Sequence, residues 1–185
     1  MNKIKIVALI GKAASGKDSI AKALLEKEPS AHGIVSCTSR PRRDYEIDGR
    51  DYHFMEPEDF AKAIEEDKML EVTNFNGWWY GTSIESLNPD TVNVGVFNPE
   101  GIQSLLEDDR IEVTVFYVMA KDKTRIIRQL TRENEPDIDE IFRRYTTDEK
   151  DFQAHYLDFQ YISMDNESSE DFFDCVETIR NIIFM

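Results

Sequence analysis

A glycine-rich loop near the N-terminus has the residue types and spacing needed to bind the phosphate groups of a nucleotide. Gly11-Lys12-Ala13-Ala14-Ser15-Gly16-Lys17 fits the G-x-x-x-x-G-K pattern of a phosphate-binding loop, and it lies between a predicted strand and a predicted helix, as that motif requires. The glycines allow backbone N–H groups to turn inward, the helix N-terminus adds partial positive charge, and the lysine can reach the β- and γ-phosphates. The residues predicted to bind ATP are Gly11, Ala13, Ala14, Ser15, Gly16, Lys17, Asp18 and Ser19.

The residue that follows the loop lysine departs from the pattern. A Ser or Thr hydroxyl usually ligates Mg²⁺ at this position, but here it is Asp18, followed by Ser19. A carboxylate about 4 Å from a phosphate oxygen is repelled by roughly 4 kcal/mol at intermediate dielectric unless a cation lies between them. Since Mg²⁺ prefers hard oxygen ligands, we predict that Asp18 ligates this ion directly or through water. The alternative is that Asp18 only stabilises the helix N-terminus, worth about 0.3–1 kcal/mol.

Segments between residues 35 and 82 carry a resemblance to a known family. They are Ser36-Cys37-Thr38-Ser39-Arg40-Pro41-Arg42-Arg43, then Glu46-Ile47-Asp48-Gly49-Arg50-Asp51-Tyr52-His53-Phe54, then Leu70-Glu71, then Gly77-Trp78-Trp79-Tyr80-Gly81-Thr82. Their order and spacing resemble the GMP-binding region of guanylate kinases, and the resemblance runs from Lys3 to the closing helix, weakening after Arg144. It implies a nucleoside monophosphate kinase that transfers a phosphoryl group from ATP to GMP or dGMP. The matching positions that bind GMP in the family are Ser36, Arg40, Arg43, Tyr52, Glu71, Tyr80 and Thr82.

The chemistry of these side chains suits a nucleoside monophosphate. Two guanidinium groups, from Arg40 and Arg43, can bind the phosphate dianion through paired N–H bonds. The phenolic hydroxyls of Tyr52 and Tyr80 can donate to the same oxygens. Guanine presents N1–H and N2–H₂ donors together, for which the carboxylate of Glu71 is the complementary acceptor. The remaining edge of the base can be met by Ser36 and Thr82.

Asn98 departs from the family and leaves alternatives open. Guanylate kinases usually carry Asp at this substrate-binding position, whereas Asn donates hydrogen bonds as well as accepting them. A deoxynucleoside monophosphate kinase with a broader range of bases is therefore one alternative. The other is a non-catalytic interaction module of guanylate kinase type, which is less favoured because such modules tend to lose the loop that Gly11, Gly16 and Lys17 preserve here.

A group of arginines is expected to form a lid over the phosphates. Arg128 and Arg132 are four residues apart on a predicted helix and share a face, and they match the family's arginines that close over the transferred group. Arg144, or Arg143, matches a third, and the acidic segment Glu133–Asp137 is predicted to be a mobile lid loop. Because positioning and charge neutralisation supply most of the catalysis of phosphoryl transfer, no general base is expected. The implied catalytic residues are Lys17, Arg128, Arg132 and Arg144.

The elements that position these residues alternate between strands and helices, which predicts a largely parallel sheet. The predicted strands are residues 3–10, 92–97, 111–119 and 161–164, and the predicted helices are residues 18–27, 56–67, 122–132, 138–152 and 168–184. With the resemblance, this implies an α/β fold of the P-loop NTPase type: a three-layer sandwich with a parallel central sheet, a small antiparallel NMP-binding insertion and a helical lid. We expect one domain over residues 1–185, with its core at 1–35, 83–120 and 150–185, the insertion at 36–82 and the lid at 121–149.

Composition limits the class of partner. The formal net charge is −15 over 185 residues, which argues against general binding of nucleic acids. No apolar run approaches the ~20 residues of a membrane span, and two widely spaced cysteines fit a reducing compartment. We therefore expect a cytoplasmic protein, monomeric or homodimeric, whose partners are small nucleotides rather than nucleic acid or membrane, with Mg²⁺ and ATP as cofactors.

Overall fold

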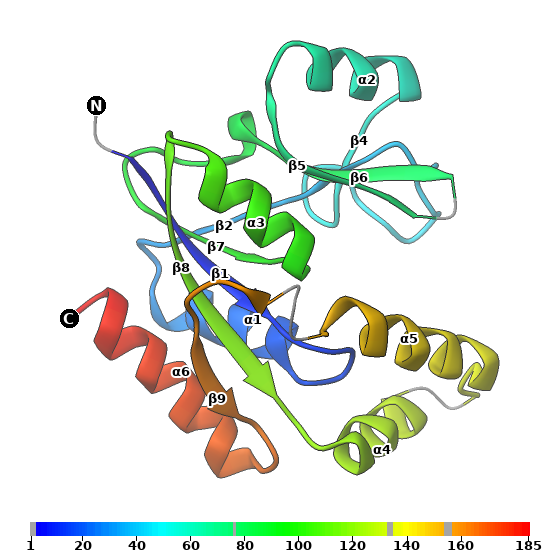
Figure 1. The fold of residues 1–185 in the computed structure, drawn as a ribbon, viewed down its shortest axis with the longest axis vertical. Coiled ribbons are helices and arrows are strands. Elements are labelled where there is room, and N and C mark those ends of the chain that lie inside the picture. Colours follow the sequence, from blue (N-terminus) through cyan, green and yellow to red (C-terminus); the bar gives the residue numbers. More distant parts are fainter. Residues whose placement is uncertain (1–2, 76, 133–134, 154–156) are drawn as a thin grey trace.

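The computed structural model describes residues 3–75, 77–132, 135–153 and 157–185, and a parallel sheet lies at its centre (Figure 1). Neighbouring strands of this sheet all run parallel, as predicted. In spatial order they are β2 (His32–Gly33), β7 (Val92–Val96), β1 (Ile4–Ile10), β8 (Ile111–Met119) and β9 (Ile162–Asp165). Strand β1 occupies the middle because its run from Ile6 to Ile10 is apolar and buried on both faces.

Helices cover both faces of the sheet, which confirms the three-layer sandwich (Figure 1). They are α1 (Lys17–Lys27) and α6 (Ser169–Ile183) on one face, and α3 (Pro99–Glu107) on the other. Alternate residues of β1 serve the two layers: Val7 and Leu9 pack with α1 and α6, whereas Ile6 and Ala8 pack with α3. Helix α3 was not among the predicted elements.

A second, smaller sheet forms the insertion (Figure 1). Its spatial order is β4 (His53–Phe54), β3 (Cys37–Thr38), β6 (Trp78–Ser83) and β5 (Met69–Phe75), with α2 (Pro57–Glu65) packed on it and the short helix η1 (Ile84–Ser86) leading out. The β3–β6 and β5–β6 pairs are antiparallel, but β3 and β4 pair in parallel, so the insertion is a mixed sheet rather than a wholly antiparallel one. The reason is the long loop between β3 and β4, which returns the chain in its original direction. The pair Asn76-Gly77 in the sequence predicts a turn between β5 and β6, but Asn76 lies outside the described residues.

Two helices form a third region at the carboxyl ends of the central strands (Figure 1). They are α4 (Asp122–Arg132) and α5 (Ile138–Asp151). Residues 133–134 of the predicted lid loop between them lie outside the described residues. Among the helices that are described, none combines the length and the apolar character needed to cross a membrane.

The closing helix α6 begins with the capping chemistry that its sequence predicts. The Ser168 hydroxyl accepts a hydrogen bond from the Asp171 N–H (3.1 Å), and the Asp171 carboxylate accepts from the Ser168 N–H (2.8 Å). This capping box satisfies two N–H groups that the start of a helix would otherwise leave unpaired. It fixes the entry of a helix whose Val176 and Ile179 are fully buried.

We expect Ser168→Ala to lower the free energy of unfolding by about 1 kcal/mol, because one N-terminal N–H group loses its acceptor. Urea unfolding should show a lower midpoint with an unchanged slope. The matched control is Ser169→Ala, which removes the same hydroxyl one residue later, inside the helix. Equal losses in the two variants would contradict the capping role.

Candidate active site

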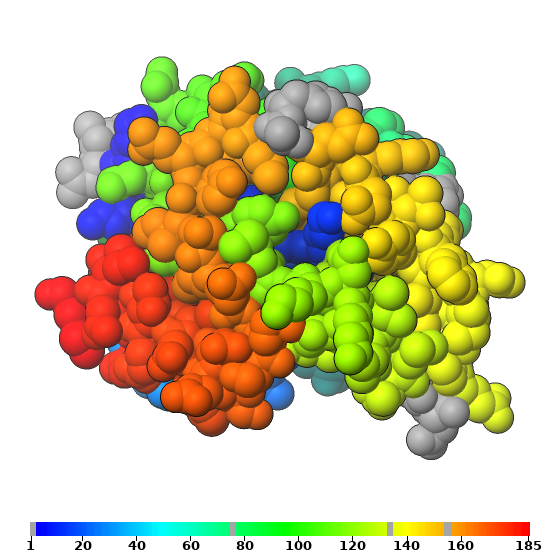
Figure 2. Space-filling view, turned by 60° about the horizontal axis from the view of Figure 1, so that its bottom comes forward, coloured from blue at the N-terminus to red at the C-terminus, as the bar shows by residue number. Residues whose placement is uncertain are grey.

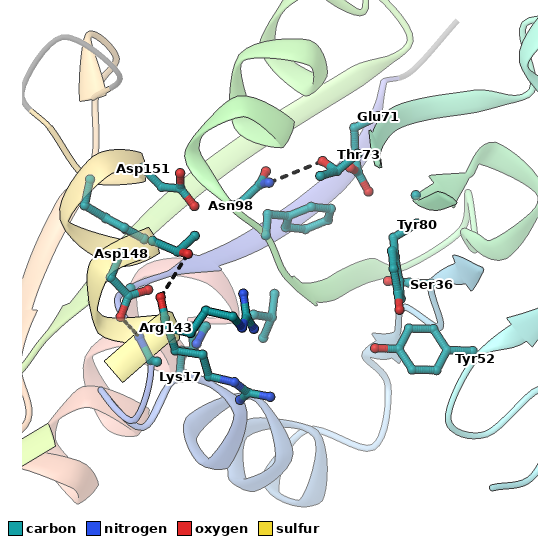
Figure 3. Close-up of a pocket in the computed structure, with 18 residues that line it drawn as sticks. Lys17, Ser36, Tyr52, Glu71, Thr73, Tyr80, Asn98, Arg143, Asp148 and Asp151 are labelled. Atoms are coloured by element: carbon teal, nitrogen blue, oxygen red, sulfur yellow. Dashed lines mark hydrogen bonds between the residues drawn. The ribbon is translucent and has the colours of Figure 1, made fainter. Parts of the chain in front are cut away.

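A cavity of about 470 Å³ opens between the phosphate loop, the insertion and helix α5 (Figure 3). Ser36, Tyr52 and Tyr80 stand on one wall, Asp148 and Asp151 on the opposite wall, and the end between them holds a third group formed by Glu71, Thr73 and Asn98 (Figure 3). Its lining residues are Gly11, Ala13, Lys17, Ser36, Tyr52, Glu71, Thr73, Tyr80, Gly81, Val96, Phe97, Asn98, Arg143, Arg144, Thr147, Asp148, Asp151 and Phe152. The fold thus brings together predicted site residues from all three regions of the chain.

The phosphate loop is held in its curled shape from outside. Gly16, the N-cap of α1, has φ 99°, and a Cβ there would lie 2.2 Å from Nδ2 of Asn166. That amide donates to the Ser15 carbonyl (2.7 Å), and Arg128 donates to the carbonyls of Ala14 (3.3 Å) and Ser15 (3.2 Å). Within the described residues no side chain caps the N–H groups of the first turn of α1, so these donors are available to an anion.

Residues Lys17 to Ser19 point to three different cavities. The Lys17 side chain is mostly buried and lines the main cavity. The Asp18 carboxylate is 79% exposed, lies 3.6 Å from the Lys17 ammonium, and faces a neighbouring cavity that shares Ser36 and Tyr52 with the main one. Ser19 lines a third cavity on the far side of the loop. Asp18 is therefore close to the lysine but remains open to solvent.

Glu71 is a half-buried acid at the end of the cavity. Thr82, itself fully buried, donates to one oxygen of Glu71 (2.8 Å) and does not line the cavity. The other carboxylate oxygen lies against the start of α3, where a Cβ on Gly101 would be 3.3 Å from it. Burial raises the pKa of Glu71, partly offset by the hydrogen bond from Thr82. Its neighbour Leu70 is buried in the core beside α3.

Asn98 lies beside Glu71, and its side-chain carbonyl oxygen already accepts a hydrogen bond. The carbonyl oxygen accepts the Gly101 N–H (2.7 Å) and caps α3, and the amide donates to the Thr73 hydroxyl (3.3 Å; Figure 3). The N-cap role fixes which end of the amide is oxygen. Asn98 therefore offers the cavity mainly a donor. Thr73 was not predicted, although it is two residues from Glu71 on the same strand and so shares its face.

The two insertion arginines do not line the main cavity. Arg40 forms a bidentate pair with Glu46 (2.7 and 3.1 Å), and its guanidinium carbon lies 5.7 Å from the centre of the Tyr52 ring. Arg43 donates to the Tyr45 hydroxyl (2.8 Å). Glu46, a buried acid that sequence reasoning missed, therefore holds Arg40 beside the tyrosine wall.

The lid arginines separate into two groups. Arg143 and Arg144 both line the main cavity, and both donate to Glu140 at 2.6–2.7 Å, which lowers the pKa of that carboxyl to about 2. Arg128 instead lines the third cavity with Asn166, behind the loop. Arg132 is exposed and is not among the lining residues of the described cavities. Position therefore does not decide whether Arg143 or Arg144 is the third lid arginine, since both line the cavity.

A phosphate loop at the end of a parallel sheet, facing a separate acceptor sheet and an arginine-bearing lid, is the architecture of nucleoside monophosphate kinases, and this chain is one of them. It belongs to the guanylate kinase family, whose model, described as guanylate kinase, matches residues 3–183. The family membership expected from the sequence is confirmed.

Individual relatives agree with this family. A guanylate kinase from Thermotoga maritima is 31% identical over 98% of this chain and 86% of its own length. Another, from Agrobacterium fabrum, is 28% identical over 89% of this chain and 76% of its own length. The crystal structure of guanylate kinase from Anaplasma phagocytophilum matches with a TM-score of 0.68 at 19% identity, over 98% of this chain and 86% of that one, and this likeness concerns the fold.

The burial of Glu71 predicts a cost in stability. Because its pKa is raised in the folded protein, the stability it contributes is present below the ordinary glutamate pKa and is lost as pH rises through the raised value. A neutral isostere avoids this loss, so Glu71→Gln should unfold at higher urea than the parent at pH 8, with the difference shrinking toward pH 4. The control is the exposed Glu112→Gln. A Glu71→Gln protein less stable than the parent at pH 8 would contradict this account.

Proposed function

We propose that this enzyme transfers the γ-phosphoryl group of ATP to GMP or dGMP, forming ADP and GDP or dGDP. The observation that carries the proposal is the half-buried Glu71, which faces the same cavity as the phosphate-loop lysine. A carboxylate held in place by Thr82 complements the adjacent N1–H and N2–H₂ donors of guanine, and no other natural base presents that pair.

The acceptor nucleotide spans the insertion side of the cavity in this proposal. The base lies against Glu71, Ser36 and Asn98, and the phosphate lies toward Tyr52 and Tyr80. The 2.7 Å and 3.1 Å bonds between Arg40 and Glu46 keep that guanidinium beside the tyrosines, where its charge favours a dianion. When the nucleotide binds, Arg43 exchanges its hydrogen bond to the Tyr45 hydroxyl for bonds to the phosphate oxygens.

The donor nucleotide lies on the other side of the loop lysine. Loop N–H groups and Lys17 bind its phosphates, and Arg144 with Arg143 neutralises charge on the transferred group. We place the adenine in the third cavity, of about 520 Å³, between Arg128, Asn166 and Phe172. A role for Arg132 in neutralising charge on the transferred group rests only on the family resemblance.

The broader-range alternative rests on Asn98. Its carbonyl oxygen already accepts the Gly101 N–H and its amide nitrogen only donates, so Asn98 is a poorer acceptor for the guanine amino group than the Asp usual in the family. Base selectivity then depends chiefly on Glu71. The non-catalytic alternative finds no support, because Lys17 lines the cavity with the arginines of α5.

Mg²⁺ is part of the proposal through Asp18. Among the described residues no group of three His, Cys, Asp or Glu side chains could hold a metal ion. This suits Mg²⁺, which usually takes one or two carboxylates and completes its shell with water and substrate phosphates. Asp18, exposed and next to Lys17, fits the role of that carboxylate. The bound ion would neutralise phosphate charge. The cytoplasmic location, the monomeric or homodimeric state and the stated domain boundaries stay predictions.

An ADP-release assay across GMP, dGMP, AMP, dTMP and dCMP tests the function. We expect turnover with GMP and dGMP, its abolition in a folded Lys17→Ala variant, and a loss of several powers of ten in kcat/KM for GMP in Glu71→Gln, with less effect on ATP. Comparable rates with dTMP or dCMP would favour the broader enzyme. Release of no ADP with any acceptor would favour the interaction module.

The metal role of Asp18 has its own test. Asp18→Ala should raise the Mg²⁺ concentration for half-maximal activity and lower kcat about tenfold, equivalent to about 1.4 kcal/mol in the barrier. Asp18→Ser should recover only part of the loss. Glu26→Ala, which removes an exposed carboxylate two turns along the same helix, is the control. An unchanged Mg²⁺ dependence in Asp18→Ala would leave Asp18 as a helix-end acid.

A further inference from the structure

A buried ion pair joins the two lid helices. Arg125 of α4 is only 1% exposed, which is rare for an arginine. Its guanidinium donates to Asp148 of α5 (2.5 Å) and to Asp122 at the start of α4 (2.8 Å). The same guanidinium lies 5.5 Å from the centre of the Tyr145 ring, whose hydroxyl donates to Asp122 (2.8 Å). One arginine therefore fastens α4 to α5.

Both members of the pair also bind the phosphate loop, and they do so at a single residue. Arg125 Nε donates to the Ala13 carbonyl (3.0 Å), and the Ala13 N–H donates to Asp148 Oδ2 (2.8 Å). Both backbone polar groups of Ala13 are thus taken by lid side chains that lie more than 100 positions away in the sequence. Figure 2 shows N-terminal atoms in blue at the floor of a hollow bordered by the lid helices and the segment around β9.

The pair also sets where the lid arginines lie. Asp148 is one helical turn after Arg144, so the two side chains share a face of α5. Both residues line the main cavity with Lys17. Because Asp148 is tied to the loop backbone, the position of Arg144 relative to the loop depends on that tie.

Stability alone does not account for such a pair. Desolvation makes a buried ion pair a weak source of stability, and apolar residues of similar volume usually replace one without loss. What apolar residues cannot do is hold both the N–H and the carbonyl of Ala13. The pair secures the geometry of the site rather than the fold.

We propose that Arg125 and Asp148 are positioning residues for phosphoryl transfer: together they fix the phosphate loop at Ala13 and dock α5 so that Arg144 faces the transferred group. The catalytic part of this statement rests on the proposed function. The attachment of the lid to the loop does not, and it can be measured without any substrate.

Steady-state kinetics with ATP and GMP test the catalytic part. Asp148→Ala should lower kcat by about 10- to 100-fold, as misplacement of reacting groups does, while the KM for GMP stays within about twofold. Asp148→Asn keeps an acceptor for the Ala13 N–H and should recover part of the rate. Asp139→Ala, which removes an exposed carboxylate from the first turn of the same helix, should leave kcat unchanged.

A double-mutant cycle separates positioning from a purely structural role. If Asp148 acts through Arg144, then Arg144→Ala should cost much less in the Asp148→Ala background than in the parent. Losses that simply multiply, or an Asp148→Ala enzyme of reduced stability and parental kcat, would overturn the proposal.

Amide hydrogen exchange of the nucleotide-free protein tests the attachment directly. Exchange at the Ala13 N–H should speed up in Asp148→Ala and in Arg125→Met, and should stay parental in Asp139→Ala. If this result holds but the parent phosphorylates no guanine nucleotide, the proposed function fails and the attachment stands. Parental exchange at Ala13 in both variants would overturn the attachment itself.

Discussion

The site depends on one constraint: a short loop of backbone must stay curled so that its N–H groups converge on the volume that phosphates use. Curling turns the loop carbonyls outward, and each carbonyl needs a donor. The structure supplies these donors from distant elements, with Asn166 and Arg128 on Ser15 and Arg125 on Ala13. The loop therefore owes its shape to the lid and to the end of β9 as much as to its own glycines.

A second constraint comes from the positive charge of the arginines in the insertion and the lid. Four arginines of the insertion and the lid each have a carboxylate beside them: Glu46 for Arg40, Glu140 for Arg143 and Arg144, and Asp148 for Arg125. Such pairs hold planar donors in fixed orientations before a substrate arrives, which is the condition for electrostatic stabilisation of a transition state. The acidic residues of this chain, which outnumber the basic ones, thus include some that position arginines.

The sequence predicted the parts of this arrangement that local patterns encode. The bounds of β8 and α4 match the structure, and the loop, Glu71 and the tyrosines could be named because motif and resemblance are read along the chain. Helix α3 was missed although Asn98 and Pro99 form an ordinary helix start and the buried Ile102 and Leu105 lie three residues apart on one face. The contact between Arg143 and Glu140 follows the i,i+3 spacing of a helix and could have been predicted from the sequence. The Arg125–Asp148 pair depends on how α4 and α5 pack, which no local pattern reveals.

Strand β5 must place an acid in the cavity and, directly before it, a leucine in the apolar core. Leu70 lies in the core beside α3 and Glu71 lies in the cavity at the start of α3, because a β-bulge between Met69 and Glu71 interrupts the alternation of side chains. Loss of the extra residue of this bulge would restore strict alternation, so that either the acid or the apolar residues before it would change to the other face of the strand. The length of this strand is therefore constrained at its bulge, whereas the long loop between β3 and β4, with its exposed Tyr45 and Ile47, leaves room for change in length.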